Sequence, residues 1–329
     1  MEYRELGTSG IKVSTISMGC WAIAGGSTWG TQDEKEALRA IKTAHDRGIN
    51  FFDTAEAYGD GYSEKLLGQA VKNFREDVVI ASKVSPGNLE PKDLRTSCEN
   101  SLRRLGTDYI DVYYIHWPSR EIPVAKTLET MEQLKKEGKI RSIACSNFGE
   151  NDFTELLQQG SVDANQLPYN LLFRAIEFDI QPICVENEVS ITCYSPIAQG
   201  LLTGKFSGPE EVPEGRARTR HFSRNRPQAR HQEQGAEKLT FSTLEKIRKI
   251  SEQTDENMVH LALSWLISRQ GVASVIVGAR NPDQIKENAR AGEIKLPPEI
   301  QKKLTEATED LKEKLGPNPD MWQTDSRYY

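Results

Sequence analysis

Short apolar runs alternate with amphipathic segments along most of the chain, a pattern that indicates parallel strands joined by helices. Six runs are clear strand candidates, and two weaker runs occupy the gaps where further strands are needed. In chain order the eight are Ile16–Gly19, Ile49–Asp53, Val78–Ser82, Ile110–Ile115, Ile140–Cys145, Asp163–Gln166, Ile191–Tyr194 and Val275–Val277. A probable turn at residues 7–10 predicts a β-hairpin before them, formed by Tyr3–Leu6 and Ile11–Ser14.

Apolar residues recur at helical spacing in the intervals between these runs. One such stripe ends at Gly106, a second ends at Gly138, and Met258–Ile267 is apolar enough to pack against the strands. Two regions depart from the alternation: Lys205–Gly235, which predicts a long loop after the seventh strand, and the tail from Leu315, which follows a last helix.

Eight strand-helix units favour a closed barrel over an open, doubly wound sheet. The open dinucleotide-binding sheet would also carry G-x-G-x-x-G at its first turn, and Gly25–Gly30 does not match that spacing. Gly200–Lys205 is one residue short of a phosphate-binding P-loop. We therefore predict an α/β fold: a (β/α)8 TIM barrel with an N-terminal β-hairpin cap and a C-terminal helix and tail, with residues 1–329 as one domain.

Composition restricts the class of protein. The formal net charge of −6 argues against a nucleic-acid partner, and we expect the basic cluster within residues 215–230 to be a loop that meets a small anion. The N-terminus has neither the basic start nor the apolar run of a signal peptide, and no apolar run in the sequence is long enough to cross a bilayer. The cysteines are predicted to be buried free thiols in a reducing cytoplasm; they are Cys20, Cys98, Cys145, Cys184 and Cys193.

Four chemically active residues follow neighbouring strands, where a barrel of this type places its active site. Asp53 and Tyr58 follow the second strand, Lys83 the third and His116 the fourth. Each has an ordinary structural explanation on its own: packing for a tyrosine, solvation for a lysine, turn capping for an aspartate. Their joint occurrence at adjacent strand ends favours a catalytic site.

The four side chains together suit the reduction of a carbonyl group. Hydride addition needs a proton donor beside the oxygen, and a phenol holds its proton at neutral pH. The Lys83 ammonium would stabilise the phenolate of Tyr58 by about 4 kcal/mol at about 4 Å, before desolvation. Asp53 would keep the lysine charged, and His116 would orient the carbonyl. The sequence shows neither a metal cluster nor a closely spaced acid pair, which a barrel hydrolase would need, so we predict no metal.

These residues lie in segments that resemble the aldo-keto reductase superfamily. The segments are Asp53–Gly59 with Ser63–Gly68, Lys83, Tyr113–Trp117, Gly138–Arg141, Ser146–Phe148, Gln166 with Tyr169 and Asn170, Tyr194–Pro196, Gly200–Lys205 and Gly278–Arg280. The likeness covers nearly the whole chain and is nearest to the bacterial stress and sugar-operon reductases and the potassium-channel beta subunits. It implies a cofactor, NADPH/NADP+ with NADH also possible.

The resemblance also implies where that cofactor binds. Ser146, Asn147 and Gln166 would hold the nicotinamide carboxamide, and Tyr194 would stack on its ring. The pyrophosphate would lie along Ser195, Pro196, Gly200, Leu201 and Lys205. Gly278, Arg280, Gln284 and Asn288 would meet the adenosine end, and Arg280 favours NADPH over NADH. Trp21, Trp29 and Trp117 are candidates for the substrate pocket, of which we select Trp21 and Trp117.

Two functions from different classes agree with these residues. The first is a reductase that converts small-molecule aldehydes or ketones to alcohols, with Tyr58 as the general acid. The second is a nucleotide-binding regulatory subunit with low turnover, which needs the same cofactor loops. His116 favours the enzyme. The sequence predicts neither a membrane partner nor the choice between a monomer and a homo-oligomer, and it leaves two roles open for the tail: cover of the pocket or an oligomer contact.

Overall fold

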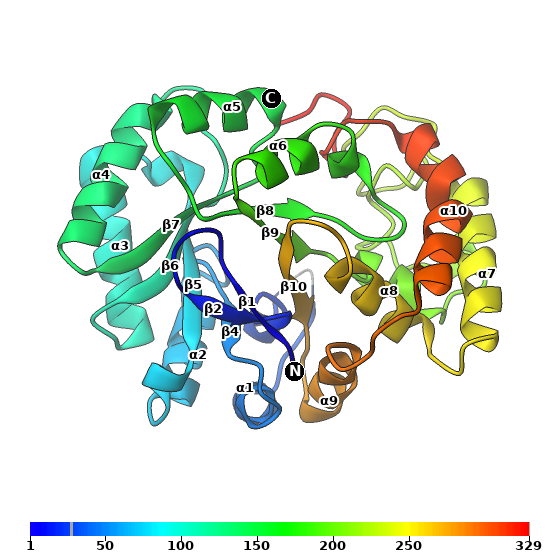
Figure 1. Cartoon of the computed structure of the whole chain (residues 1–329), viewed down its shortest axis with the longest axis horizontal. Helices are drawn as coiled ribbons and strands as arrows, with labels where there is room; N and C mark the ends of the chain where they lie inside the picture. Colours follow the sequence, from blue (N-terminus) through cyan, green and yellow to red (C-terminus); the bar gives the residue numbers. More distant parts are fainter. Residues whose placement is uncertain (27–28, 329) are drawn as a thin grey trace.

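Eight parallel strands close into a barrel that is surrounded by helices (Figure 1). The computed structural model describes residues 1–26 and 29–328, so part of the Gly25–Gly30 loop and the last residue of the tail lie outside the described residues. The barrel order β10-β3-β4-β5-β6-β7-β8-β9 confirms the predicted fold. The strands are β3 Ile16–Gly19, β4 Phe51–Asp53, β5 Val79–Val84, β6 Ile110–Ile115, β7 Ile140–Ser146, β8 Ala164–Pro168, β9 Ser190–Tyr194 and β10 Val272–Gly278.

Helices connect the strands on the outside of the barrel. Side-chain caps fix several helix starts; Asp33, for example, accepts a hydrogen bond from the Glu36 N–H at the start of α1. The helices are α1 Glu34–Asp46, α2 Tyr62–Val71, α3 Pro91–Leu105, α4 Val124–Lys136, α5 Glu150–Gln159, α6 Ile180–Glu186, α7 Glu237–Glu252, α8 Met258–Ile267, α9 Pro282–Ala291 and α10 Pro298–Leu315. None of these helices combines the length and the apolarity that a membrane span requires.

The predicted hairpin forms from β1 Tyr3–Glu5 and β2 Lys12–Ser14, and its apolar side chains close one end of the barrel. Leu6 and Val13 are fully buried against the residues that fill the barrel interior. Gly7 passes so close to the chain at Asp163 that a Cβ atom would lie 2.3 Å from a backbone oxygen. Because the hairpin occupies this end, a ligand must enter from the other end, where the strands terminate.

Two strands that carry site residues have limits that differ from the predicted ones. The prediction begins the second strand at Ile49, but β4 begins at Phe51. The Asn50 side chain bonds the hairpin, accepting from the Ser14 N–H at 2.7 Å and donating to the Lys12 carbonyl at 2.9 Å, while its own carbonyl accepts from the Val79 N–H at 2.7 Å. The third strand is longer than predicted and contains Lys83, which the sequence placed after it.

Two apolar layers form the core, and they alternate along each strand as the pleat requires. In β5, Val79 and Ala81 belong to the cluster that fills the barrel, whereas Ile80 and Val84 pack outward against the helices. Lys83 shares the inward parity of Val79 and Ala81, and it is fully buried. The strand pattern therefore directs this lysine into the barrel rather than into solvent.

The C-terminal tail, residues 316–328, leaves α10 and crosses toward α5 (Figure 1, red). Helices α10 and α7 pack side by side before it. The Arg120 side chain joins the tail to α5, because it donates to the Arg327 carbonyl at 2.9 Å and also pairs with Asp152. The tail thus lies over the end of the barrel that is opposite the hairpin.

Candidate active site

The last inward positions of several strands carry the predicted polar residues. Asp53 follows the inward Phe51 on β4, and Lys83 follows Ala81 on β5. Ser146 and Gln166 occupy the corresponding positions of β7 and β8, where they are register partners. The two-residue period of parallel strands therefore brings these side chains to one end of the barrel.

A buried ion pair lies beneath the Tyr58 hydroxyl. The Lys83 Nζ atom is 2.6 Å from Asp53 Oδ1, 2.9 Å from the Thr54 carbonyl oxygen and 3.2 Å from the Tyr58 hydroxyl. All three donor positions of the ammonium are therefore used, one of them on the phenol. The structure thus brings together Asp53, Tyr58 and Lys83, the first three predicted catalytic residues.

Burial and charge act in opposite directions on this cluster. Burial acts to lower the pKa of Lys83, but the Asp53 carboxylate and the Tyr58 phenol together raise it above its ordinary value, so the lysine stays protonated. Burial raises the pKa of Tyr58, and the neighbouring Lys83 offsets part of that rise. The phenol therefore holds its proton at neutral pH, although the lysine does not lower its pKa overall.

His116 lies beside Tyr58 as a neutral imidazole. The two rings meet edge to face, with centroids 5.9 Å apart. Burial, with a smaller contribution from the Lys83 charge, lowers the pKa of His116 to about 3. A neutral imidazole carries one N–H, so His116 can donate one hydrogen bond to an oxygen placed near the phenol.

The turn that carries Tyr58 is braced by residues to which the sequence assigned no role. Glu64, fully buried at the start of α2, accepts hydrogen bonds from Ser82 and from Arg104, each at 2.5 Å. The Arg104 side chain covers Gly61, where a Cβ atom would lie 2.3 Å from it. Glu64 lies within the segment that carries the family resemblance, which was the only available signal for it.

The predicted carboxamide residues form one hydrogen-bonded group. Asn147, which has a positive φ of 64°, donates through Nδ2 to the His116 carbonyl at 2.9 Å and to the Ser146 hydroxyl at 3.1 Å. Its Oδ1 atom accepts from the Tyr194 hydroxyl at 2.9 Å. Gln166 donates to Asp53 Oδ2 at 2.8 Å, which links this group to the ion pair.

Aromatic side chains surround the phenol. Trp21 stacks on Tyr58 with ring centroids 5.9 Å apart, and Trp29 meets Trp21 edge to face. Trp117 instead lies against Tyr328 of the tail, with centroids 5.2 Å apart. The two tryptophans selected for the substrate pocket thus contact different rings, Trp21 that of Tyr58 and Trp117 that of Tyr328, a tail residue that the sequence did not identify.

Basic residues gather over the start of the β9 loop, where the sequence predicted a pyrophosphate site. Ser195, Pro196 and Leu201 follow β9, and a Cβ atom at Gly200 would lie 3.5 Å from Arg216 and 3.8 Å from Lys205. Burial and the Arg216 charge lower the pKa of Lys205. Within the described residues, neither cation forms a salt bridge. An uncompensated pair of cations beside glycine backbone suits a diphosphate.

The remaining arginines of residues 215–230 differ in their surroundings. Arg220 and Arg226 are structural, since they pair with Glu233 and Glu237 respectively. Burial, with the nearby Arg230 charge, lowers the pKa of Arg218. The sequence did not distinguish these arginines, because no periodic pattern in this loop shows which of them meet Glu233 and Glu237.

The predicted adenosine end forms at the C-terminus of β10 and the start of α9. Gly278 ends the strand, Gln284 accepts a hydrogen bond from the Arg280 N–H at 2.8 Å, and Asn288 is buried beside Gly278. Among the described residues, the Arg280 guanidinium donates to oxygens of residues 29–32, including the Gln32 side chain at 2.7 Å and the Trp29 carbonyl at 2.9 Å. No carboxylate in the described part of the chain neutralises it, which leaves its charge for an anion.

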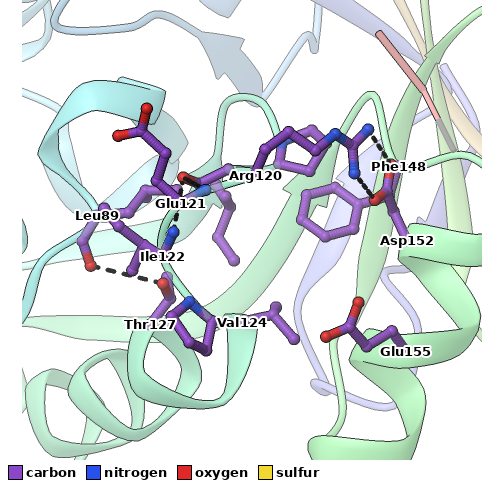
Figure 2. A pocket seen from close by; sticks show the side chains of 13 residues that line it. Leu89, Arg120, Glu121, Ile122, Val124, Thr127, Phe148, Asp152 and Glu155 are labelled. Atoms are coloured by element: carbon purple, nitrogen blue, oxygen red, sulfur yellow. Dashed lines mark hydrogen bonds and ion pairs between the residues drawn. The ribbon is translucent and has the colours of Figure 1, made fainter. Parts of the chain in front are cut away.

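A cavity of about 310 Å³ is lined by the loop after β6, the start of α4 and residues of α5 (Figure 2). Its floor is apolar, including Leu89, Ile122 and Phe148, and Arg120 reaches across its edge to Asp152. No catalytic candidate lines it. Among the residues that the structure describes, no group of three or more His, Cys, Asp and Glu side chains is arranged to hold a metal, and the five cysteines are buried free thiols, as predicted.

The fold and the site define a class: a (β/α)8 barrel with a tyrosine above a buried lysine–aspartate pair. The family model for the Aldo/keto reductase family matches residues 15–309. The NADH-specific methylglyoxal reductase of Escherichia coli is 35% identical, over 90% of this chain and 95% of its own. A probable voltage-gated potassium channel subunit beta of Arabidopsis thaliana is 31% identical, over 89% of this chain and 92% of its own.

Solved structures agree with the sequence relatives. An aldo-keto reductase of Klebsiella pneumoniae in complex with NADPH superposes with a TM-score of 0.73 at 28% identity, covering 96% of each chain. This protein belongs to the aldo/keto reductase family.

Proposed function

We propose that this protein reduces the carbonyl group of small aldehydes or ketones to an alcohol, with NADPH or NADH as hydride donor and Tyr58 as proton donor. The observation that carries the proposal is the 3.2 Å contact between the Tyr58 hydroxyl and the buried Lys83 ammonium. The relatives support the cofactor class: one is named NADH-specific, and another is solved with NADPH.

The residues present fit such a cofactor. Asn147 and Gln166 present amide groups that can bind a carboxamide, next to the tyrosine hydroxyl. Lys205 and Arg216 suit a diphosphate, and Arg280 suits a phosphate at the adenosine end, because none of the three forms a salt bridge within the described residues. A nicotinamide bound in this way would supply the hydride.

The side chains of the site orient the substrate carbonyl and supply the proton. The neutral His116 donates a hydrogen bond that orients the carbonyl oxygen toward Tyr58. As the carbonyl carbon becomes tetrahedral, its oxygen takes the proton from the Tyr58 hydroxyl, and the product is the alcohol. The phenolate that remains is stabilised by Lys83, whose charge Asp53 balances. The rings of Trp21 beside Tyr58 and of Trp117 beside Tyr328 support a preference for substrates with an apolar or aromatic part.

Substitution of the proton donor tests this proposal. In Tyr58→Phe, we expect turnover to fall by about 100- to 10,000-fold, while the dissociation constant of NADPH stays within about twofold. The assay is nucleotide oxidation at 340 nm with a panel of carbonyls that includes methylglyoxal and an aromatic aldehyde. Tyr62→Phe, an exposed tyrosine four residues away, is the control. Undiminished turnover in Tyr58→Phe would contradict the proposed acid.

A second function is favoured by one observation, the similarity to a probable channel beta subunit. In that case the protein would act as a regulatory subunit, and nucleotide binding would change its effect on a partner protein. Copurification of a stable partner together with nucleotide binding, and turnover below about one per hour on the whole carbonyl panel, would favour this function over the reductase.

A further inference from the structure

The C-terminal tail places a buried tyrosine inside the candidate nicotinamide site. Tyr328 is only 3% exposed, and its hydroxyl donates to Asn147 Oδ1 at 2.5 Å. The same hydroxyl lies 2.9 Å from that of Tyr194, and its ring packs against Trp117. The tail thus contacts the carboxamide residues and the substrate pocket at the same time.

This contact saturates the amide group of Asn147. The Oδ1 atom accepts from the Tyr194 and Tyr328 hydroxyls, and Nδ2 donates to His116 and Ser146. An amide oxygen has two lone pairs, so a third donor can bond to it only after one of the two tyrosine hydroxyls has left. Tyr194 is held in strand β9, whereas Tyr328 belongs to a tail without helix or strand. Tyr328 is therefore the phenol that a carboxamide NH2 would displace.

A second tail residue faces the ring on which a nicotinamide would stack. The Trp322 indole lies parallel to the Tyr194 phenol, with an angle of 8° between the planes and 6.0 Å between the centroids. Trp322 therefore presents a flat ring to Tyr194, and Tyr328 presents a hydrogen-bond donor to Asn147. A nicotinamide has the same two features, an aromatic ring and a carboxamide N–H.

The first part of the tail is held to the rest of the chain, so only its last residues are placed to move. Asp320 is fully buried; its carboxylate binds the Arg327 guanidinium at 2.7 Å and accepts from the Trp322 backbone N–H at 3.0 Å. Arg220 bonds the Asn318 carbonyl through its side chain and the Met321 carbonyl through its backbone N–H, each at 2.8 Å, and the Thr324 hydroxyl accepts from the Gln232 N–H at 2.8 Å. Withdrawal of Tyr328 therefore needs movement only of the residues after Thr324, with release of the Arg327 contacts.

We propose that the tail is an internal competitor for the nicotinamide end of the cofactor: Tyr328 closes the carboxamide site in the free protein and withdraws when the nucleotide binds. This inference rests on the proposed function, because it needs a nicotinamide site at Asn147. Its consequence follows from population arithmetic. Only the fraction of molecules with the tail withdrawn binds, so the apparent dissociation constant exceeds the intrinsic one by the inverse of that fraction.

Two variants measure this competition. Tyr328→Phe removes the hydroxyl and keeps the ring, and truncation after Asp325 removes Tyr328 and Arg327 while keeping Asp320 and Trp322. We expect NADPH and NADH to bind about threefold more tightly to the first and about tenfold more tightly to the second. Tyr3→Phe is the matched control, because it removes a phenol oxygen at the opposite end of the barrel, where Tyr3 bonds the Gly48 carbonyl. Binding is followed by tryptophan fluorescence quenching.

Hydrogen exchange of the full chain provides the second measurement. Exchange of tail peptides should rise when NADPH is added, because the tail withdraws. Unchanged or weaker binding in both variants, or tail exchange that falls with NADPH, would overturn the inference and make Tyr328 a support of the bound cofactor. The proposed function fails separately, if neither the wild-type chain nor any variant binds either nucleotide, and the inference then fails with it.

Discussion

Gln166 donates a hydrogen bond across 2.8 Å to Asp53 Oδ2, the carboxylate oxygen that Lys83 does not contact. Both oxygens of Asp53 are thereby held, one by the ammonium beneath Tyr58 and the other by a residue of the candidate carboxamide site. The two halves of the site therefore share one carboxylate, and a change at Asp53 should affect both the phenol and the cofactor.

The first prediction concerns that carboxylate. Asp53→Asn leaves the fully buried Lys83 without its counter-charge, and removal of one partner from a buried pair costs about 3–5 kcal/mol. Part of this cost disappears if the lysine loses its proton, and the phenol then loses its neighbouring cation. We expect kcat to fall by at least about 100-fold and the free energy of unfolding in urea to fall by about 3 kcal/mol.

Asp46→Asn is the control for this variant. Asp46 pairs with Lys42 one helical turn away on the exposed face of α1. Such surface pairs contribute about 0.5 kcal/mol or less, so neither stability nor activity should change measurably. If Asp53→Asn were as stable and as active as this control, the buried pair would have no role.

The second prediction concerns nucleotide preference. Arg280 donates only to oxygens of residues 29–32 and has no carboxylate partner in the described chain, so its charge is free for a phosphate. In Arg280→Met, we expect the dissociation constant of NADPH to rise about 10- to 100-fold and that of NADH to change by less than about threefold. Because the substitution also releases residues 29–32, Gln32→Leu serves as the control for loop release. An equal loss for both nucleotides would show that Arg280 does not discriminate the 2′-phosphate.

The third prediction concerns the proton state of His116. Burial lowers its pKa to about 3, so this imidazole stays neutral above pH 5. We expect kcat/KM in the wild-type protein to show no ionisation with an apparent pKa between 6 and 7. His116→Gln retains a hydrogen-bond donor, and its profile should have the same shape at a lower rate. An acidic limb near pH 6.5 that disappears in His116→Gln would contradict the neutral assignment.

The barrel and the positions of the candidate catalytic residues could be predicted from the sequence, because both depend on local periodicity. Eight apolar runs specify eight strands, and the two-residue period places Asp53 and Lys83 on the inward face at the strand ends. The position of Lys83 differs from the prediction. The sequence placed it after the third strand, whereas it lies within β5, where Asp53 neutralises it inside the barrel.

The parts that the sequence did not specify depend on contacts between distant segments. The Asn50 side chain bonds the hairpin, and Glu64 accepts a hydrogen bond from Arg104, an arginine on α3. Tyr328 meets Asn147 across 181 positions of sequence. No periodicity marks any of these residues. For the tail, the sequence therefore left two roles open, covering the pocket or contacting another subunit. In the structure the tail contacts Asn147 and Trp117, two residues of the candidate site.

The last prediction concerns stability in acid. His221 is a buried neutral imidazole between the Leu172 carbonyl, 2.9 Å from Nε2, and the Thr219 hydroxyl, and burial lowers its pKa to about 4. The unfolded chain takes up a proton near pH 6.5, before the folded chain does. The stabilising contribution is therefore complete above pH 6.5 and is lost as the pH falls toward 4, by at most about 1.4 kcal/mol per pH unit.

The slope of unfolding free energy against pH between 6 and 4.5 measures this effect. His221→Asn removes one titrating group, so its slope should be smaller than that of the wild-type protein by up to about 1 kcal/mol per pH unit. Carboxylates titrate alike in both proteins and cancel in the difference. Equal slopes in the two proteins would mean that His221 is protonated in the folded state, and that the loop carrying it is more open to water than the structure shows.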